Sequence, residues 1–338
     1  MAGRIVRAAV VGASTLLGKE LADELNQAKT VTWDLTLLDT PEAGGQIAAA
    51  GDEALVIQPV SAEAFAHIDV AFFAGEQATV LEFWKIAHAV GASIVDLTGA
   101  LEGKPNVIVR TPFVEDGTRP DLTTVAVVSA HAAAIILAST NAELLPLGLR
   151  RMAATMLQPA SELGSAGVEE MHQQTVGLLS FKPLKKDVYD AQVAFNVVAS
   201  IGDSAKVDLE RVRQKIGRQI EVIAGAGTIG PIALQLIQVP VFHGYTASVF
   251  VEFGSSVTKE AVSAALRGGE LRMVEERSPS NETAAGRGEV FFRVTATDSN
   301  EGSAFWLWIA ADNLRLAARN AVACAMELVE LRPTKNVN

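Results

Sequence analysis

The first 128 residues alternate continuous apolar runs with segments of helical periodicity, and this alternation most constrains the fold. Uninterrupted runs of Val, Ile, Leu and Phe are typical of parallel strands that are buried on both faces. The helical segments between them supply the crossover connections of such a sheet. The sequence therefore predicts a doubly wound α/β domain. Its expected strands cover 7–11, 32–38, 55–60, 70–74, 93–97 and 124–128, and its expected helices cover 19–26 and 79–90.

After residue 129 the pattern changes to longer strands with helices between them. Long strands in a mixed order indicate an α+β domain with a mixed or antiparallel sheet. A last helix follows, with apolar residues from Leu314 to Val329 on one face. Because 338 residues exceed the usual size of one core, we expect two domains, 1–128 and 129–310, and a final helix over 311–331. The expected strands of the second domain are 150–158, 232–241, 246–253, 289–296 and 304–310.

Composition narrows the classes of partner. The chain has 49% hydrophobic and 20% charged residues and a net charge of −11, which is typical of a globular protein. Its negative charge, without clustered Lys and Arg, argues against nucleic acid and anionic membranes as partners. The apolar stretch 8–17 is too short to span a bilayer and contains a Gly/Ser turn, so we interpret it as a buried strand. We expect a cytoplasmic protein.

Cysteine and histidine usage gives no metal site. The single cysteine, Cys324, excludes an intramolecular disulfide and a cysteine metal cluster. The five histidines do not have the spacing of metal ligands. Cys324 lies in the last expected helix, where we interpret it as a small buried hydrophobe.

A glycine-rich turn follows the first expected strand. Gly12 and Gly18 occupy the outer positions of a Gly-x-x-Gly-x-x-Gly pattern, in which backbone N–H groups approach a pyrophosphate at the start of a helix. Thr15 replaces the middle glycine, and a β-branched side chain there narrows the space for a pyrophosphate and disfavours a positive φ. The turn predicts a dinucleotide site of Rossmann type, with a plain strand-to-helix connection as the alternative.

Acidic residues follow the second expected strand. An acid at this place accepts hydrogen bonds from the ribose diol of NAD, whereas Asp39 and Glu42 repel the 2′-phosphate of NADP. NAD is therefore favoured over NADP if a dinucleotide binds. The alternatives are that Asp39 only begins a polar turn and that no dinucleotide binds.

Four motifs occur in a characteristic order. They are the turn 12–18, the segment 158–170 that begins Gln-Pro-Ala-Ser, the segment 238–246 that begins Gln-Val-Pro-Val, and the segment 312–315 with the sequence Asp-Asn-Leu-Arg. In this order and spacing the chain resembles aspartate-semialdehyde dehydrogenase over nearly its whole length, and most closely the paralogues that lack the catalytic cysteine.

The resemblance implies a role for each expected domain. Residues 1–128 correspond to a Rossmann-type NAD(P)-binding domain, and residues 129–310 correspond to a catalytic and dimerisation domain. The helix over 311–331 returns to the nucleotide-binding domain in that family. The resemblance also implies a homodimer.

The catalytic positions of the family are occupied by other residues in this chain. The nucleophilic cysteine corresponds to Ala132, and the substrate-binding Arg and general-base His correspond to Gln238 and Tyr245. A neutral amide cannot form a charged bidentate pair with a carboxylate, and Tyr is a poor base near neutral pH. An Arg that binds phosphate corresponds to Glu102, which repels it. None of these catalytic groups is therefore retained.

Other polar residues remain candidates for a remodelled pocket. Gln158 corresponds to the substrate-orienting glutamine of the family, and His131 and His243 lie near the lost nucleophile and base. If 243 and 245 both lie in a strand, their side chains share a face. The alternative is that each histidine is an ordinary hydrogen-bonded residue. From the turn, the strand ends and the resemblance, the expected cofactor-binding residues are Gly12, Ser14, Thr15, Leu16, Leu17, Gly18, Asp39, Ala74, Gly75, Thr98 and Asn313.

Three functions stay open at this point. The first, which we favour, is a degenerate paralogue that keeps a dinucleotide-type pocket and a homodimer and acts in binding or regulation. The second is an NAD-dependent oxidoreductase that uses non-covalent chemistry on a small aldehyde or carboxylate. The third is a structural interaction partner.

Overall fold

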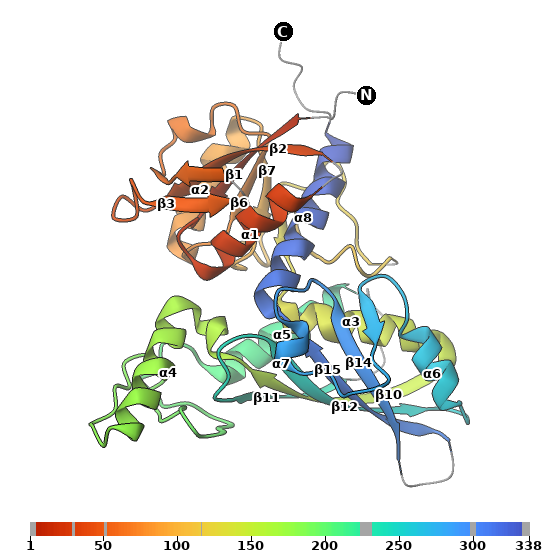
Figure 1. Cartoon of the computed structure of the whole chain (residues 1–338). Coiled ribbons are helices and arrows are strands. Elements are labelled where there is room, and N and C mark those ends of the chain that lie inside the picture. The colour runs from red at the N-terminus through yellow and green to blue at the C-terminus, as the bar shows by residue number, and fades with distance from the viewer. Residues whose placement is uncertain are drawn as a thin grey trace. The chain divides into compact units, whose positions relative to one another are not determined.

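The computed structural model describes residues 5–28, 31–50, 53–115, 117–223, 232–297 and 302–332 (Figure 1). Its contacts divide the chain into two compact units. Unit 1 comprises Met1–His131 and Ala317–Asn338, and unit 2 comprises Ala132–Leu316.

Unit 1 contains a seven-stranded sheet in the order β5-β2-β1-β6-β7-β9-β8, and every pairing in it is parallel. The predicted doubly wound parallel sheet is confirmed. A small antiparallel hairpin, β3 with β4, lies outside this sheet. The strands are β1 Ile5–Val11, β2 Thr32–Asp39, β3 Ile47–Ala50, β4 Glu53–Val56, β5 Gln58–Pro59, β6 Val70–Phe73, β7 Ser93–Asp96, β8 Val107–Arg110 and β9 Ala126–Ser129.

The helices of unit 1 are α1 Leu16–Gln27, α2 Gln77–Ala89 and most of α8 Asn313–Leu331. The apolar face of α8 joins the same core as β1, β6 and α1, and Cys324 lies fully buried in this core. Burial also raises the pKa of the Cys324 thiol far above its usual range, because the thiolate would lose its hydration. The interpretation of Cys324 as a buried hydrophobe is confirmed.

Unit 2 contains a mixed six-stranded sheet in the order β11-β10-β12-β15-β14-β13. The β10–β11 and β13–β14 pairs are parallel and the other pairs are antiparallel. This arrangement confirms the predicted mixed sheet. The elements are α3 Ala132–Leu144, β10 Leu149–Gln158, α4 Gly164–Leu179, α5 Leu209–Ile223, β11 Ile232–Gln238, β12 Tyr245–Phe253, α6 Lys259–Ala265, β13 Leu271–Met273, α7 Asn281–Ala284, β14 Val290–Ala296 and β15 Ala304–Ala311.

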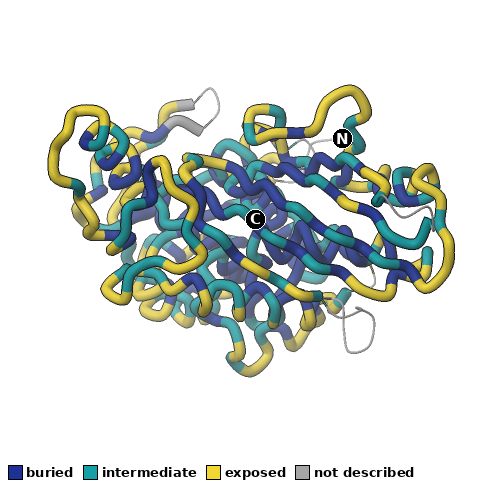
Figure 2. The backbone as a smooth tube through the Cα atoms, turned by 90° about the horizontal axis from the view of Figure 1, so that it is seen from below, coloured by how far each residue is buried: buried dark blue, intermediate teal, exposed yellow. Residues whose placement is uncertain are grey.

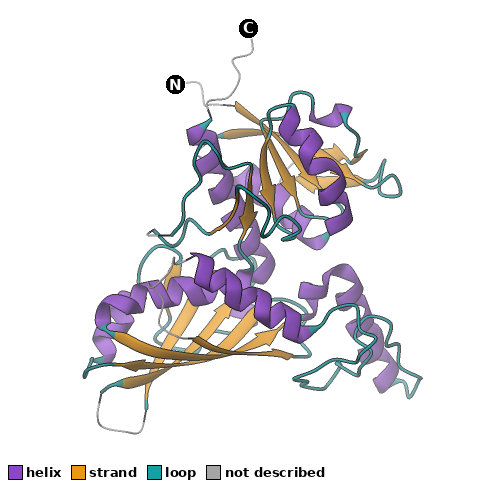
Figure 3. Cartoon of the chain, turned by 180° about the vertical axis from the view of Figure 1, so that it is seen from behind, coloured by secondary structure: helices purple, strands orange, loops and turns teal. Residues whose placement is uncertain are grey.

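Among the described residues, helices cover one face of the unit 2 sheet and leave the other without a helix. Figure 3 shows α3, α5 and α6 packed along that face, and Figure 2 looks onto the opposite face, where the strands lie bare. The bare face carries large apolar side chains. Phe250 on β12 packs edge-on against Trp306 on β15, with ring centroids 5.3 Å apart, and 46% of Trp306 stays exposed. An exposed aromatic pair on a sheet marks a surface suited to association.

Strand β8 is the main element of unit 1 that the sequence pattern missed. Its apolar run is short and ends in a charged residue, Arg110. In the structure only 2% of the Arg110 side chain is exposed, because its guanidinium makes two hydrogen bonds to Glu327 on α8, of 2.9 and 2.6 Å, and one to the Val114 carbonyl. The Asn320 amide of α8 donates to the Arg110 carbonyl and to Ser129 Oγ. In the sequence, the charge of Arg110 suggests the end of a strand. In the structure, Arg110 therefore fixes α8 to the edge of the sheet.

Within the described residues, no helix is both long enough and apolar enough to cross a membrane.

The Arg110–Glu327 ion pair predicts a measurable loss of stability. Glu327→Ala leaves a buried guanidinium without its counter-charge, and breaking such a pair costs about 3–5 kcal/mol of unfolding free energy. Denaturant unfolding followed by circular dichroism measures this loss. Glu330→Ala removes an exposed carboxylate from the same helix and is the matched control. Equal midpoints for the two variants would contradict a stabilising role for the pair.

Candidate functional site

The glycines of the turn after β1 are required by close backbone packing. Gly12 has φ +90°, and a Cβ placed on it would lie 2.3 Å from the backbone of Gly75. A Cβ on Gly18 would lie 2.1 Å from the Gly12 carbonyl oxygen. The turn, the start of α1 and the end of β6 therefore meet backbone to backbone. This packing brings the predicted residues at 12, 14, 15, 18, 74 and 75 together in unit 1.

Thr15 fits the turn without strain. It is the N-cap of α1 at φ −71°, and its Oγ1 accepts a hydrogen bond from Gly18 N at 2.9 Å. The hydroxyl also lies 2.8 Å from the Gly12 carbonyl oxygen and 3.0 Å from that of Ala74, so its proton is directed into the turn. This position does not need a positive φ, and the β-branched side chain carries no backbone penalty here.

Asp39 is bound to the turn itself. Its buried carboxylate accepts hydrogen bonds from Ser14 N at 2.7 Å and from Thr40 N at 2.8 Å. Nearby Glu42 is exposed, and hydrogen bonds from its own backbone and from Thr40 lower its pKa. Glu42 therefore carries a negative charge near the end of β2 at neutral pH. One amide of the glycine turn is already occupied by a carboxylate.

The loop after β7 is organised by Asp96, which sequence reasoning missed. Its fully buried carboxylate accepts hydrogen bonds from Thr98 N and Oγ1, Gly99 N and Leu101 N at 2.7–3.2 Å. The Thr98 hydroxyl, predicted to contact a cofactor, is thus engaged with Asp96. Glu102 lies in the turn that follows. The signal in the sequence was an Asp at a strand end before Thr-Gly, a typical Asx turn.

In unit 2, Ala132 is the first residue of α3 and is buried. A side chain at this helix start would lie at the positive end of the helix dipole, where a thiolate is stabilised. Ala132 presents only a methyl group. His131, directly before it in the chain, is half-buried and belongs to unit 1.

Gln158 and Gln238 bind each other. They are paired in register at the ends of β10 and β11, and both side chains are buried. Gln158 Nε2 donates to Gln238 Oε1, and Gln238 Nε2 donates to the carbonyls of Gln158 and Val239, each at 3.1 Å. The amide of Gln238 is therefore fully used within the protein. Gln158 Oε1 is buried and has no hydrogen-bond partner among the described residues.

His243 and Tyr245 do not lie in one strand, so the condition for a shared face is not met. β12 begins at Tyr245, and the preceding Gly244 has φ +84°, which turns the chain before the strand starts. His243 is exposed, whereas Tyr245 is buried. Burial, with a smaller contribution from the Glu162 carboxylate, raises the pKa of Tyr245 well above its usual range. The phenol stays protonated near neutral pH and cannot act as a base.

Sequence reasoning also missed Glu162, which takes part in a polar cluster of unit 2. Its carboxylate accepts a hydrogen bond from Asn313 Nδ2 at 2.7 Å. Asn313 Oδ1 in turn accepts from Ser161 Oγ at 3.1 Å and from Gly244 N at 2.9 Å. Asn313, predicted to bind a cofactor, therefore joins three segments of unit 2. No local pattern in the sequence distinguishes this acid from an exposed one.

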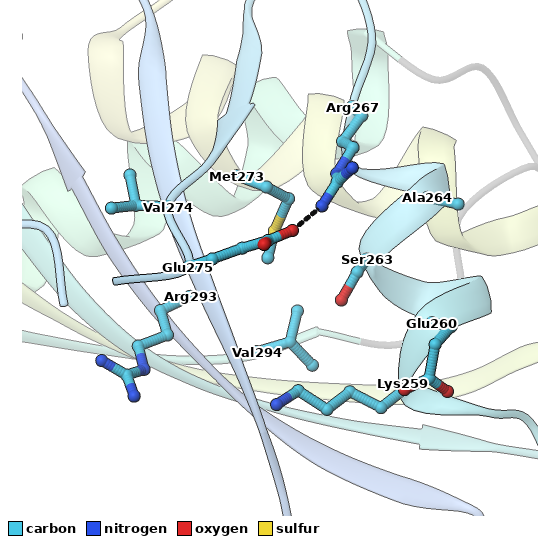
Figure 4. A pocket seen from close by; sticks show the side chains of 10 residues that line it. All are labelled: Lys259, Glu260, Ser263, Ala264, Arg267, Met273, Val274, Glu275, Arg293 and Val294. Atoms are coloured by element: carbon cyan, nitrogen blue, oxygen red, sulfur yellow. Dashed lines mark hydrogen bonds and ion pairs between the residues drawn. The ribbon is translucent and has the colours of Figure 1, made fainter. Parts of the chain in front are cut away.

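The cavities described in unit 2 are lined by other residues. The cavity in Figure 4 has a volume of 460 Å³ and lies between α6 and the strands β13 and β14. An ion pair between Arg267 and Glu275 crosses it, and Val294 forms part of its wall. None of the sequence-predicted site residues lines it. This cavity therefore does not account for the motifs.

Comparisons with known proteins identify the relatives of this architecture. Residues 7–143 match the family model of the semialdehyde dehydrogenase NAD-binding domain, and residues 142–316 match that of the semialdehyde dehydrogenase dimerisation domain. The USG-1 protein homolog of Azotobacter vinelandii is 29% identical over 331 residues, which cover 95% of this chain and 97% of the relative. The aspartate-semialdehyde dehydrogenase of Rickettsia bellii is 25% identical over 333 residues, with the same coverage of both chains.

A solved structure agrees with these matches. The structure of a probable aspartate-semialdehyde dehydrogenase from Pseudomonas aeruginosa superposes with a TM-score of 0.85 at 30% identity. The superposition covers 97% of this chain and 99% of that one. Both domain models and the whole-chain matches follow the order of the motifs, and the chain therefore belongs to the semialdehyde dehydrogenase family.

Proposed function

We propose that this protein is a paralogue of aspartate-semialdehyde dehydrogenase that has lost the thiol chemistry and acts as a binding or regulatory homodimer. The observation that carries the proposal is the state of the family's catalytic positions. Ala132 has no nucleophilic atom, Gln238 is saturated by neighbouring groups, and burial keeps Tyr245 protonated. These positions hold buried groups that stabilise the fold instead of groups that react.

Buried polar groups that bind one another are poor catalysts. A general base needs an accessible lone pair and a pKa near the working pH. An amide whose donors and acceptor are all occupied must break hydrogen bonds before it binds a substrate carboxylate, and each broken bond in a buried site costs about 1–3 kcal/mol. Substrate binding at Gln238 is therefore disfavoured as well as catalysis.

One observation supports the second candidate, an oxidoreductase with non-covalent chemistry. Gln158 Oε1 is buried and has no hydrogen-bond partner among the described residues. A ligand that donates a hydrogen bond to such an acceptor would be stabilised by it, because an unsatisfied buried acceptor costs free energy. A hydroxyl or amine of a small substrate would supply that donor. His243 of unit 2 stays a candidate for proton transfer in such a pocket. Only the second candidate predicts catalytic turnover of a substrate.

The dinucleotide that the fold suits best is NAD. In unit 1, Asp39 and Glu42 supply two negative charges where the adenosine ribose of a dinucleotide would bind, and the start of α1 would hold the pyrophosphate. The carboxylate of Asp39 is suited to a ribose diol and repels a 2′-phosphate. A bound nicotinamide would supply hydride-transfer chemistry, and the residues of unit 1 would bind and orient it.

The homodimer is proposed to form through the bare face of the unit 2 sheet. Phe250, Trp306 and Trp308 line up on this face of β12 and β15, and the segment that contains them matches the family's dimerisation domain. Covering the half-exposed Trp306 stabilises an assembly because apolar area leaves water.

The cofactor proposal predicts that NADP binds more weakly than NAD, by roughly tenfold, or about 1.4 kcal/mol. Asp39→Asn keeps an oxygen for Ser14 N but removes one charge, so it should reduce the difference between the affinities for NAD and NADP. Asp34→Asn removes an exposed charge from the same strand and is the control. Fluorescence or calorimetric titration with both nucleotides measures the difference. Tighter binding of NADP to the unaltered protein would overturn the assignment, and no binding of either would remove the dinucleotide site.

The catalytic proposal predicts that neither the unaltered protein nor Ala132→Cys oxidises aspartate semialdehyde at a useful rate. A thiol needs a base and a positioned carbonyl, and such groups act as a unit. Combining Ala132→Cys with Gln238→Arg and Tyr245→His should give more activity than the sum of the single changes. Phosphate-dependent formation of NADH or NADPH is the readout, with circular dichroism as a folding control. Robust turnover by Ala132→Cys alone would contradict the proposal that the other catalytic groups of the family have been lost.

The assembly proposal predicts a dimer at micromolar concentration in light scattering. Trp306→Glu places a charge within the proposed interface and should raise the dimer dissociation constant by about tenfold or more. Leu122→Glu changes an exposed apolar residue of unit 1 in the same way and should leave the constant unaltered. A monomeric wild-type protein would exclude the homodimer.

A further inference from the structure

The cavity of Figure 4 lies at an edge of the unit 2 sheet that β13 leaves partly open. β13 pairs with β14 only over Val290 to Phe292. Among the described residues no strand continues beside β14 on this side after Phe292, and the cavity lies between this part of β14 and α6 (Figure 4). Its volume is 460 Å³, and cavities that bind small molecules have about 300–1,000 Å³. The cavity therefore has the size of a small-molecule site.

Val294 directs backbone groups towards this open edge. The hydrogen bond from Thr297 N to the Ala304 carbonyl fixes which residues of β14 bond to its antiparallel neighbour β15. Bonding alternates along a strand, so the N–H and C=O of Val294 point to the other side. The Val290 N–H, on that same side, donates to the Glu270 carbonyl at 2.8 Å, at the level of β13. No described strand reaches Val294 on this side, and its N–H is therefore a donor for a ligand.

Helix α6 supplies a cation and a hydroxyl to the same cavity. Lys259 and Ser263 are one turn apart, so they share a helix face, and both line the cavity. In Figure 4 the Lys259 side chain extends from α6 towards β14. Glu260 follows Lys259 in the chain, but adjacent residues of a helix do not face each other. Among the described residues, no carboxylate forms an ion pair with Lys259.

Arg293 adds a second cation without a counter-charge. Among the described residues its guanidinium makes one hydrogen bond, of 3.5 Å to Ser278 Oγ, and no ion pair. A guanidinium has five N–H donors, so most of them stay available to a ligand. The lining contains three cationic side chains and two carboxylates, and the ion pair between Arg267 and Glu275 uses one of each. The cavity therefore has a net positive charge, which favours an anion.

Apolar side chains form another part of the wall. Val294 is buried, and Met273 and Val274 at the end of β13 are half-buried. A methionine side chain adapts to the shape of a bound group. The apolar body of a ligand is stabilised on such a wall because its surface leaves water. An inorganic anion has no apolar body, so the combination of cations, donors and apolar wall matches a small organic anion better.

We propose that the cavity between α6 and β14 binds a small organic carboxylate. Lys259 and Arg293 supply the positive charge that attracts the carboxylate. The Val294 amide and the Ser263 hydroxyl supply hydrogen-bond donors, and Met273 contacts the apolar body of the ligand. None of the family's catalytic positions lines this cavity. The site is therefore independent of the dinucleotide and of the homodimer proposed above.

Benzoate and benzamide test the site, because they have nearly the same shape and differ in charge. Saturation-transfer NMR on the whole chain should show benzoate binding with a dissociation constant of about 1 mM, and benzamide binding about tenfold more weakly. Lys259→Met removes the charge and keeps most of the aliphatic chain, so it should weaken benzoate binding by about fivefold or more. Arg293→Met should act in the same direction. Lys206→Met removes an exposed lysine of unit 2 outside the cavity and should leave the binding unchanged.

Benzoate binding that depends on Lys259 and Arg293 but not on Lys206 supports the proposal. If Lys259→Met and Arg293→Met bind benzoate as the unaltered protein does, the cavity is not the site and the proposal is overturned. Equal affinities for benzoate and benzamide would also overturn it, since charge would then contribute nothing. Absence of benzoate binding at about 10 mM would exclude the carboxylate site. Inorganic phosphate that binds as tightly as benzoate would contradict the organic class of the ligand.

Discussion

Polar side chains that are buried must find their hydrogen bonds within the protein, and this constraint governs the side chains at the ends of β10 and β11 in unit 2. Gln238 satisfies its amide with Gln158 and the backbone, and Asn313 satisfies its amide with Glu162, Ser161 and Gly244. A donor or acceptor that forms one of these hydrogen bonds within the fold is not available to bind a substrate. The resulting hydrogen bonds join the segments after β10 and β11 and the start of α8.

The cofactor turn follows a different constraint. Gly12 and Gly18 are glycines because backbone atoms of other segments occupy the space of a Cβ. The pattern would persist in this fold even without a nucleotide, because the close packing of the strand, the helix and the end of β6 requires it. Asp39 is more informative about a ligand than the glycines are, since close packing does not require a carboxylate at this turn and a carboxylate would repel a ligand phosphate.

Sequence patterns predicted the fold well because both units obey strong periodicities. Continuous apolar runs gave β1, β2, β6, β7 and β9, and alternating runs gave the five long strands of unit 2. β8 was missed because Arg110 breaks its apolar pattern, and only the tertiary partner Glu327 explains that burial. Glu162 was missed for the same reason, because an acid that accepts a hydrogen bond from a distant segment looks identical in sequence to a solvated one. Asp96 differs, because its partners are local and the Asp before Thr-Gly is a signal that the sequence carries.

The residues that break local rules separate into two groups. At Gly12 the fold needs glycine and the chain supplies it, whereas at position 181 the helix cap favours glycine and the chain supplies phenylalanine. Arg110 and Glu162 also depart from local expectation, but each is compensated by hydrogen bonds within the described chain. Phe181 and Phe195 have no such compensation, because their rings face solvent. A positive φ that no contact within the described chain offsets is a strained position, and the stability of this chain alone does not explain it.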